Sequence, residues 1–355
     1  MNKKISIIVP VYSNLFLKEC ILSLMAQTYS NLEFIFVLDG QRDNSKEIVQ
    51  EFQRNDNRIK IFIEPNLGVA NARNIGLLNA SGDFISFVDS DDLIDSKMCE
   101  KLAGEFRKNK EIDLICFGLD IFGDENVGDK AKDCKYYDIK FDGIKKFEAS
   151  LFSKIDGSVC NKIFKKDIII QNNIKFPFGL RYEDCAFCIK YLSVCRNLFF
   201  IKDKFYKYRR RQNSTMAKTF AGCDFALEHL FILDDIFQFF IKNEKFEEFF
   251  DVFVEFFVSF FYFSLNYSTI EKRIEVLNSA NYLAHKFFIG RKIENKLINC
   301  LLNKDFEAIF EKDLKFYQKI FSLSNNYSIL TNEKEKYLYF LGKKFLLKKK
   351  KEVLF

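Results

Sequence analysis

The first 90 positions alternate between short apolar runs and segments with a helical spacing of hydrophobic residues. Continuous apolar runs of this length are typical of strands that are buried on both faces of a parallel sheet. The segments between them repeat apolar residues every three or four positions, as an amphipathic helix does. The pattern predicts strands over 5–11, 33–38, 58–63 and 84–88, and helices over 17–28, 45–52 and 69–79. This βαβαβαβ order predicts an α/β fold with right-handed crossovers and a mostly parallel open sheet.

The pattern is less regular after residue 110. From residue 221 onward the chain is rich in Phe, lacks Pro and has helical spacing, which predicts an all-helical C-terminal region. We therefore place a domain boundary near residue 220, between a first domain with halves 1–110 and 111–220 and a second domain over 221–355. Within the first domain we expect a strand over 113–119, amphipathic helices over 141–152 and 162–170, and a helix after 181–184.

Carboxylates gather where two of the predicted strands end. Asp39 follows the second strand, and the stretch FISFVDSDD (84–92) places Asp89, Asp91 and Asp92 directly after the fourth. Ligands bind beyond the carboxyl ends of the strands in open α/β sheets, so we expect both acidic groups at one crevice. Neighbouring carboxylates raise one another's pKa unless water, donors or a cation compensates. The acidic run is therefore either a solvated turn with a helix cap or a cation site.

Composition narrows the classes of function. The chain has 355 residues, 48% of them hydrophobic, which is enough for a large domain and a smaller one. Two His and ten Cys without a CxxC pair argue against a zinc site and against histidine catalysis, and favour reduced thiols in the cytoplasm. A net charge of +6 does not suggest a nucleic-acid partner. No GxGxxG follows the first strand, and GDENVGDK (123–130) lacks the lysine of a phosphate-binding loop.

Three segments bear on whether the chain contacts or crosses a membrane. The N-terminal apolar run is interrupted by Pro10, Ser13 and Asn14, which favours a strand over a signal peptide. The apolar segment 256–265 is shorter than the ~20 residues that span a bilayer. Six lysines between Lys343 and Lys351 form either a solvated chain end or a peripheral contact with an anionic membrane surface.

Five segments, in this order, resemble the family 2 glycosyltransferases of the GT-A fold. They are IVPVYS (8–13), FVLDGQRDNS (36–45), NLGVANARNIGL (66–77), SGDFISFVDSDD (81–92) and YED (182–184). The resemblance covers the first 220 residues. It implies that 1–110 binds a nucleotide sugar and that 111–220 binds an acceptor.

The resemblance also implies a metal-dependent donor site. Asp89, Ser90 and Asp91 look like the family's DxD motif, with Asp91 as the direct ligand of Mn²⁺ or Mg²⁺ and Asp89 as a second ligand nearer the ribose. A divalent cation held by carboxylates and phosphate oxygens would compensate the charge of the diphosphate. It would also act as a Lewis acid on the leaving group.

Nucleotide contacts follow from the same resemblance. Asp39 matches a residue that accepts hydrogen bonds from the base, usually uracil, and Pro10 and Tyr12 would form walls of the base pocket. This chain has Leu38 where the family commonly has a second acidic residue, and Ser13 where it usually has Asn. Arg73 resembles a nucleotide-contacting arginine, the alternative being a salt bridge on a helix surface.

The basic run from Tyr208 to Arg211 resembles a family segment that closes over the donor as a loop. Arg209 and Arg211 would neutralise the diphosphate or hold an acidic acceptor. The alternative is a solvated edge. Lys162, in CNKIF, is expected near the acceptor.

Transfer to a hydroxyl group needs a general base. Neither His lies near a motif, so a carboxylate is required. Glu183 and Asp184 resemble the family's ED pair, with Asp184 as the expected base and Glu183 as second choice. The alternative is a capping cluster at the start of a helix.

Together these features indicate an inverting, metal-dependent transferase. It would move a hexose or N-acetylhexosamine from a nucleotide sugar, usually a UDP-sugar, to a glycan or glycolipid acceptor in lipooligosaccharide or capsule biosynthesis. A sugar-nucleotide pyrophosphorylase is one alternative, although VPVYSNLF lacks the expected Gly-rich loop. The other is a non-catalytic interaction protein on a GT-A scaffold, with the Phe-rich C-terminal region as its functional part. The helical spacing of Phe in that region indicates core packing by default, and the alternative is a homodimer interface or a surface that docks on the inner membrane together with the lysine cluster.

Overall fold

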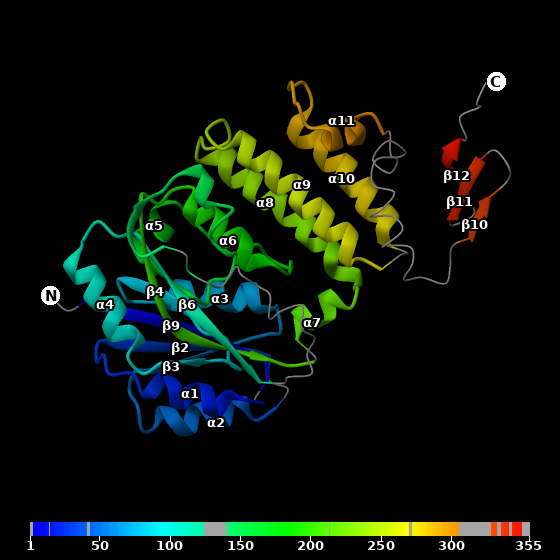
Figure 1. Cartoon of the computed structure of the whole chain (residues 1–355). Helices are drawn as coiled ribbons and strands as arrows, with labels where there is room; N and C mark the ends of the chain where they lie inside the picture. Colours follow the sequence, from blue (N-terminus) through cyan, green and yellow to red (C-terminus); the bar gives the residue numbers. More distant parts are fainter. Residues whose placement is uncertain are drawn as a thin grey trace, which may run out of the picture.

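The computed structural model describes residues 3–13, 15–40, 43–123, 139, 141–212, 214–269, 272–304, 328–331, 335–340 and 343–349. A twisted sheet forms the centre of an α/β body, and long helices make a further layer beyond it (Figure 1). The α/β fold predicted from the sequence is confirmed.

The N-terminal half of the sheet is parallel, in the order β3-β2-β1-β4. Every residue of β1 and β2 is buried, as their continuous apolar sequences predict. Helices α1 and α2 lie on one side of these strands and α3 on the other (Figure 1). The bounds are β1 Ile5–Val11, α1 Leu17–Met25, β2 Leu32–Asp39, α2 Ser45–Gln53, β3 Ile59–Glu64, α3 Val69–Asn79 and β4 Phe84–Phe87.

The second half continues the sheet with mixed pairing. Strand β8 lies antiparallel between β4 and β6, and β9 runs parallel to β6 along its other side. Strands β5 and β7 both pair antiparallel with β9. The bounds are β5 Leu93–Ile94, α4 Met98–Lys108, β6 Leu114–Gly123, β7 Gly143–Lys146, η3 Ala149–Leu151, β8 Lys162–Lys165, α5 Lys166–Gln171, α6 Glu183–Leu192 and β9 Asn197–Arg210.

Three sequence expectations in this half are wrong. Residues 141–152 form β7 and the short helix η3 instead of one helix, because Gly143 has φ 81° and the next residues pair with β9. Residues 162–165 form β8, since the gap between β4 and β6 requires a paired strand, and α5 begins only at Lys166. The basic run ends strand β9 and is not a loop, because its backbone continues the ladder with β6.

The helical region follows β9 and begins with α7, while the domain boundary near residue 220 stays a prediction. Helix α8 packs against α6, and α9 and α10 stack on α8 (Figure 1). Phe253, Phe257 and Phe260 are buried between these helices, so their helical spacing reflects core packing. None of the helices in the described ranges combines the length and hydropathy required of a bilayer-spanning segment. The bounds are α7 Thr215–Phe220, η4 Asp224–Leu227, α8 Glu228–Lys242, α9 Phe250–Tyr267, α10 Arg273–Phe288 and α11 Lys296–Leu302.

The end of the chain departs from the all-helical expectation. Strands β10 (Ser328–Thr331), β11 (Glu335–Phe340) and β12 (Lys343–Lys349) form an antiparallel sheet, because their backbones pair in register. The lysine cluster therefore begins on a strand, and Lys350 and Lys351 lie outside the described residues.

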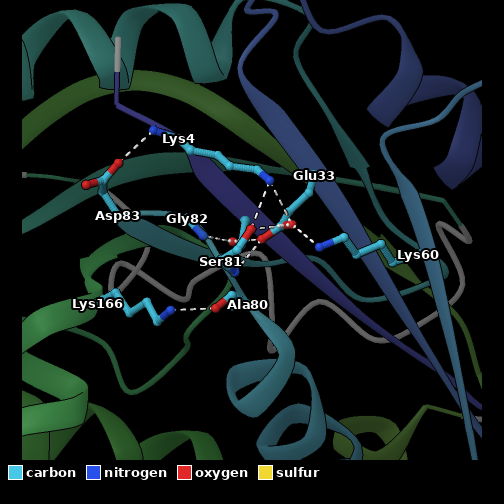
Figure 2. A network of polar contacts seen from close by, with 9 residues as sticks. Lys4, Glu33, Lys60, Ala80, Ser81, Gly82, Asp83 and Lys166 are labelled. Carbon is cyan, nitrogen blue, oxygen red and sulfur yellow. Dashed lines mark hydrogen bonds and ion pairs between the residues drawn. The ribbon is translucent and has the colours of Figure 1, made fainter. Parts of the chain in front are cut away.

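A buried polar network joins the amino ends of the parallel strands. Glu33 of β2 is 1% exposed and accepts hydrogen bonds from the ammonium groups of Lys4 (3.0 Å) and Lys60 (2.6 Å) (Figure 2). It also accepts bonds from the Ser6 hydroxyl, the Ser81 hydroxyl (2.8 Å) and the Ser81 N–H (2.6 Å). Contacts from β1, β3 and the segment before β4 thus meet at one carboxylate, which fixes the order and register of these strands.

Candidate active site

The opposite edge of the sheet carries the predicted acidic groups. Asp39 ends β2, and its carboxylate accepts hydrogen bonds from the N–H groups of Leu67 (2.7 Å) and Gly68 (2.9 Å). Gly68 has φ 93°, a conformation that favours glycine, and α3 begins at the next residue. Asp39 therefore orients the loop that starts α3. Its contact with a base stays a prediction.

The acidic run is held in place by β9. Asp92 is 1% exposed and accepts hydrogen bonds from the Tyr206 hydroxyl (2.6 Å) and the Arg209 N–H (2.7 Å). The same hydroxyl accepts a bond from the Asp89 N–H (3.1 Å). Burial, with Asp89 and Asp91 adding to it, raises the pKa of Asp92 well above its usual range. Asp92 thus anchors the turn and leaves Asp89 and Asp91 as the more exposed carboxylates.

Asp91 is paired with Arg211, which directly follows β9. Its carboxylate accepts bonds from Nε (2.6 Å) and Nη2 (2.5 Å) of Arg211, and its carbonyl accepts one from Arg209 Nε (2.8 Å). Burial and the charge of Asp89 raise the pKa of Asp91, while Arg211 opposes the rise. The structure therefore brings both predicted arginines to the acidic run. Arg209 also contacts Glu19 at 2.6 Å, which makes it a link between β9 and α1.

Arg210, which the sequence interpretation passed over, differs from its two neighbours. It is 8% exposed, and its Nε and Nη2 are buried without a hydrogen-bond partner. Tyr206 and Arg210 share one face of β9, because side chains alternate along a strand. A buried guanidinium with unused donors is costly unless an anion reaches it.

Arg73 links the acidic run to the ED pair. This side chain from α3 is 4% exposed and donates hydrogen bonds to Asp89 Oδ1 (2.8 Å) and to Glu183 Oε1. Its guanidinium also lies 5.5 Å from the centroid of the Phe176 ring. The alternative of a salt bridge on a helix surface is therefore wrong, because the side chains of Arg73 and Glu183 are both buried.

Glu183 and Asp184 form the first turn of α6. Burial raises the pKa of Glu183 to about 7, with Arg73 opposing the rise and Asp184 adding to it. Burial likewise raises the pKa of Asp184, whose Oδ1 accepts a bond from the Cys185 N–H (2.8 Å). Glu183 is buried in its ion pair, whereas Asp184 is partly exposed. Asp184 is thus the more exposed member of the pair.

The expectation that Lys162 lies near the acceptor is wrong. This lysine is fully buried, and its ammonium donates to Asp156 Oδ1 (3.0 Å), the Ser158 carbonyl (2.7 Å) and Asn161 Oδ1 (2.8 Å). It stabilises the loop before β8. That loop carries Cys160, another residue missed from the sequence, to within 3.6 Å of Asp89 Oδ2.

The remaining predicted residues lie at the same edge. Pro10 is buried in β1 opposite Val37, and Tyr12 is 54% exposed just beyond the strand. Ser90 is half-buried between the two exposed carboxylates of the acidic run. Within the part of the chain that the structure describes, no group of three or more His, Cys, Asp and Glu side chains is placed to hold a metal ion.

Known proteins share both sequence and fold with this chain. The family model for glycosyl transferase family 2 matches residues 6–171. Glycosyltransferase GlyG of Streptococcus pneumoniae is 32% identical over 231 residues, which cover 62% of this chain and 75% of GlyG. The match to the family model ends at residue 171, the last residue of α5, so it lies within the α/β body.

Solved structures extend the likeness over nearly the whole chain. S. aureus TarS 1–349 in complex with UDP-GlcNAc has a TM-score of 0.64 and 19% identity, covering 97% of this chain and 99% of TarS 1–349. The mannosyltransferase PcManGT from Pyrobaculum calidifontis, in complex with GDP-Man and Mn²⁺, has a TM-score of 0.51 and 13% identity, covering 90% and 84%. At these identities the structures show a common fold.

Proposed function

The chain belongs to glycosyltransferase family 2, and we propose that it transfers a hexose or N-acetylhexosamine from a UDP-sugar to a hydroxyl group of a glycan or glycolipid. The observation that carries this proposal is the buried Arg73, which connects Asp89 of the acidic run to the ED pair at the start of α6. One arginine thus joins the carboxylates suited to a donor site with the carboxylates suited to proton transfer. Membership of this family makes the protein a transferase, which displaces the pyrophosphorylase and interaction-protein alternatives.

The donor set fits a hard divalent cation. Asp89 and Asp91 offer carboxylate oxygens that are partly exposed, and Mg²⁺ or Mn²⁺ typically binds one or two carboxylates together with phosphate oxygens. Burial and, after it, the charge of Asp89 raise the pKa of Asp91, and a cation would relieve the repulsion between the two carboxylates. When bound, the cation supplies Lewis-acid stabilisation of the leaving diphosphate. PcManGT, which has the same fold, was solved with Mn²⁺.

The nucleotide would lie along the ends of β1 and β2. Asp39 would accept a hydrogen bond from the base, between Pro10 and Tyr12. The UDP-GlcNAc bound by TarS supports a uridine nucleotide. Arg211 and Arg209 would lie beside the diphosphate, because both donate hydrogen bonds to Asp91. Arg210 has guanidinium nitrogens without a hydrogen-bond partner, which could bind an anionic group.

Asp184 would act as the base. It accepts the proton of the acceptor hydroxyl while that oxygen bonds to the anomeric carbon, and the bond from this carbon to the UDP oxygen breaks. A single displacement of this kind inverts the anomeric configuration. The raised pKa of Asp184 makes its carboxylate a stronger base than an ordinary aspartate. Glu183, held by Arg73, would fix the first turn of α6 beside it.

Binding of UDP to the purified protein tests the donor site. We expect calorimetry to show UDP binding that requires Mn²⁺, that exceeds GDP binding, and that is lost in Asp91→Ala. Asp120→Ala is the matched control, because Asp120 is an exposed carboxylate paired with Lys204 on the surface. The absence of binding to either nucleotide with or without metal would overturn the proposal.

We place the reaction in the assembly of a bacterial cell-surface glycan such as lipooligosaccharide or capsule, at the cytoplasmic face of the membrane. The bacterial relative GlyG and the fold shared with TarS support a bacterial glycan. A peripheral contact through Lys343 to Lys351 and a homodimer belong to the same proposal.

A further inference from the structure

Tyr182, the residue directly before the ED pair, has an unusual backbone conformation. Its φ is 63° and its ψ 22°, in the left-handed region, and it occupies the N-cap position of α6. Residues other than glycine are uncommon in this region, and a bulky residue adopts it only where contacts with neighbouring residues stabilise the conformation. The orientation of Glu183 and Asp184 therefore depends on the contacts that keep Tyr182 in this conformation.

The contacts of the Tyr182 side chain come from α7, α8 and α9. Its hydroxyl lies 2.9 Å from the Thr219 hydroxyl, and its ring packs edge-on against the rings of His229 (4.8 Å between centroids) and Phe263 (5.5 Å). Thr219 is fully buried and donates its own proton to the Thr215 carbonyl at 2.9 Å. Tyr182 must therefore be the donor in the bond between the two hydroxyls.

The preceding residue is fastened to the same helices. The Arg181 N–H and guanidinium donate to the two oxygens of Glu228, at 2.7 Å and 2.5 Å. Glu228 is the first residue of α8. The Arg181 guanidinium also lies 4.3 Å from the centroid of the Phe225 ring. Residues 181 and 182 are thus anchored on the helices after residue 214, immediately before the chain enters α6.

His229 contributes to this packing as a neutral ring. Burial lowers its pKa to about 3, and its ring lies 4.2 Å from the centroids of Phe260 and Phe263. It thereby presents an uncharged face to Tyr182.

We infer that the helices from α7 to α9 are part of the catalytic machinery, because they hold Tyr182 in its left-handed conformation and thereby position the carboxylate of Asp184. Tyr182 is a positioning residue, and Thr219 is its anchor. The inference rests on the proposed role of Asp184 as base. It gives the helical region a function that the alternatives of membrane docking or dimerisation do not include.

Kinetics of the full-length protein test this role. Tyr182→Phe and Thr219→Val each remove the bond between the two hydroxyls while they keep the size of the side chain. Tyr282→Phe is the matched control, because the Tyr282 side chain on α10 is 65% exposed. Release of UDP is measured with UDP-GlcNAc, UDP-glucose and UDP-galactose, with water as acceptor. We expect kcat to fall ~10-fold or more in both variants, because misplacement of a catalytic group is costly, while KM for the donor and the affinity for UDP stay unchanged. The double variant should be no slower than Thr219→Val alone, since Thr219→Val already removes the bond that Tyr182→Phe removes.

The inference would be overturned by an unchanged kcat in both single variants, or by a loss of UDP affinity that matches the loss of kcat. Failure of the unaltered protein to bind UDP would count instead against the proposed function. Hydrogen exchange then decides the inference. Tyr182→Phe must raise exchange at residues 183–188 and leave α3 unchanged, and equal exchange at 183–188 would refute the anchoring.

Discussion

Arg73 and Glu183 lie 110 positions apart in the sequence and form an ion pair in which the two side chains are only 5% and 8% exposed. The second partner of Arg73 is Asp89, whose side chain is 32% exposed. Arg73 therefore ties the start of α6 to the acidic run after β4. A substitution of Arg73 should therefore disturb both the acidic run and the ED pair.

Arg73→Met should destabilise the fold by ~3–5 kcal/mol, because breaking a buried pair leaves an uncompensated buried charge. Urea unfolding followed by circular dichroism measures the loss. Lys108→Met is the control, since its i,i+3 pair with Glu105 is on the surface and such pairs contribute ~0–1 kcal/mol. Equal stability losses in the two variants would show that the Arg73 bridge is no stronger than a surface pair.

Asp184→Asn should abolish transfer and leave donor binding intact. The amide keeps the shape of the side chain but cannot take the proton, and a general base typically contributes 10²–10⁴-fold to the rate. UDP release and UDP calorimetry, carried out on the same preparation, separate the two effects. Asp167→Asn, an exposed position in the first turn of α5, is the control. A loss of UDP affinity in Asp184→Asn would refute the assignment of the base.

Glu183 should make stability fall as the pH rises from 5 to 8. Its pKa is about 7 in the folded protein, because of burial, and ~4.3 in an unfolded chain, so the folded state binds the proton more tightly between these values. Its contribution to stability is thus present below the unfolded pKa and is lost as the pH rises through 7. Melting temperatures across this range should fall less steeply in Glu183→Gln. The raised pKa values of Asp91, Asp92 and Asp184 act in the same direction, so part of the slope should remain. Identical slopes in the two proteins would exclude Glu183 as a contributor.

Removal of the residues after position 340 should weaken binding to anionic vesicles. The lysines from 343 to 351 would each contribute ~1 kcal/mol near negatively charged headgroups. Sedimentation with phosphatidylglycerol vesicles measures the effect, and vesicles of phosphatidylcholine alone are the control. Equal sedimentation of the full-length and shortened proteins would remove the proposed membrane contact.

The first half of the fold could be predicted because its signals are local. Strands β1 and β2 are buried on both faces, so their whole sequences are apolar, and the helices between them have a clear apolar stripe. Residues 141–152 have a comparable spacing, yet residues 143–146 among them form β7, because they pair with β9. Competition of this kind between helix and strand is decided by distant partners, which a local pattern does not contain.

The site follows the same division. Asp89, Asp91 and Asp184 could be predicted because they belong to short motifs with a recognisable order. Tyr206 could not, since its contact with Asp92 depends on the pairing of β5 with β9, in which Ile94 lies opposite Tyr206. A strand predicted over 197–210 would have pointed to Tyr206. The charged residues between Lys202 and Lys207 interrupt the apolar pattern on which such a prediction depends.

Glu33 should make the protein sensitive to acid. Burial alone would raise the pKa of Glu33, but hydrogen bonds from Lys60, Ser6, Ser81 and Lys4 outweigh it and hold the pKa well below its usual range. A lowered pKa stabilises the fold above the unfolded value of ~4.3, and this contribution is lost progressively as the pH falls from that value through the lower pKa of the folded protein.

Glu33→Gln should therefore cost ~2 kcal/mol or more at pH 7, because several bonds to a buried charge are weakened together, and less at pH 3. Urea unfolding at the two pH values measures the difference. Glu248→Gln is the control, because Glu248 is 55% exposed and paired only with Lys245 in the same turn of chain. If Glu33→Gln lost the same stability at pH 3 as at pH 7, the charge of Glu33 would not be what stabilises the amino ends of the strands. The network would then depend on the packing of this side chain.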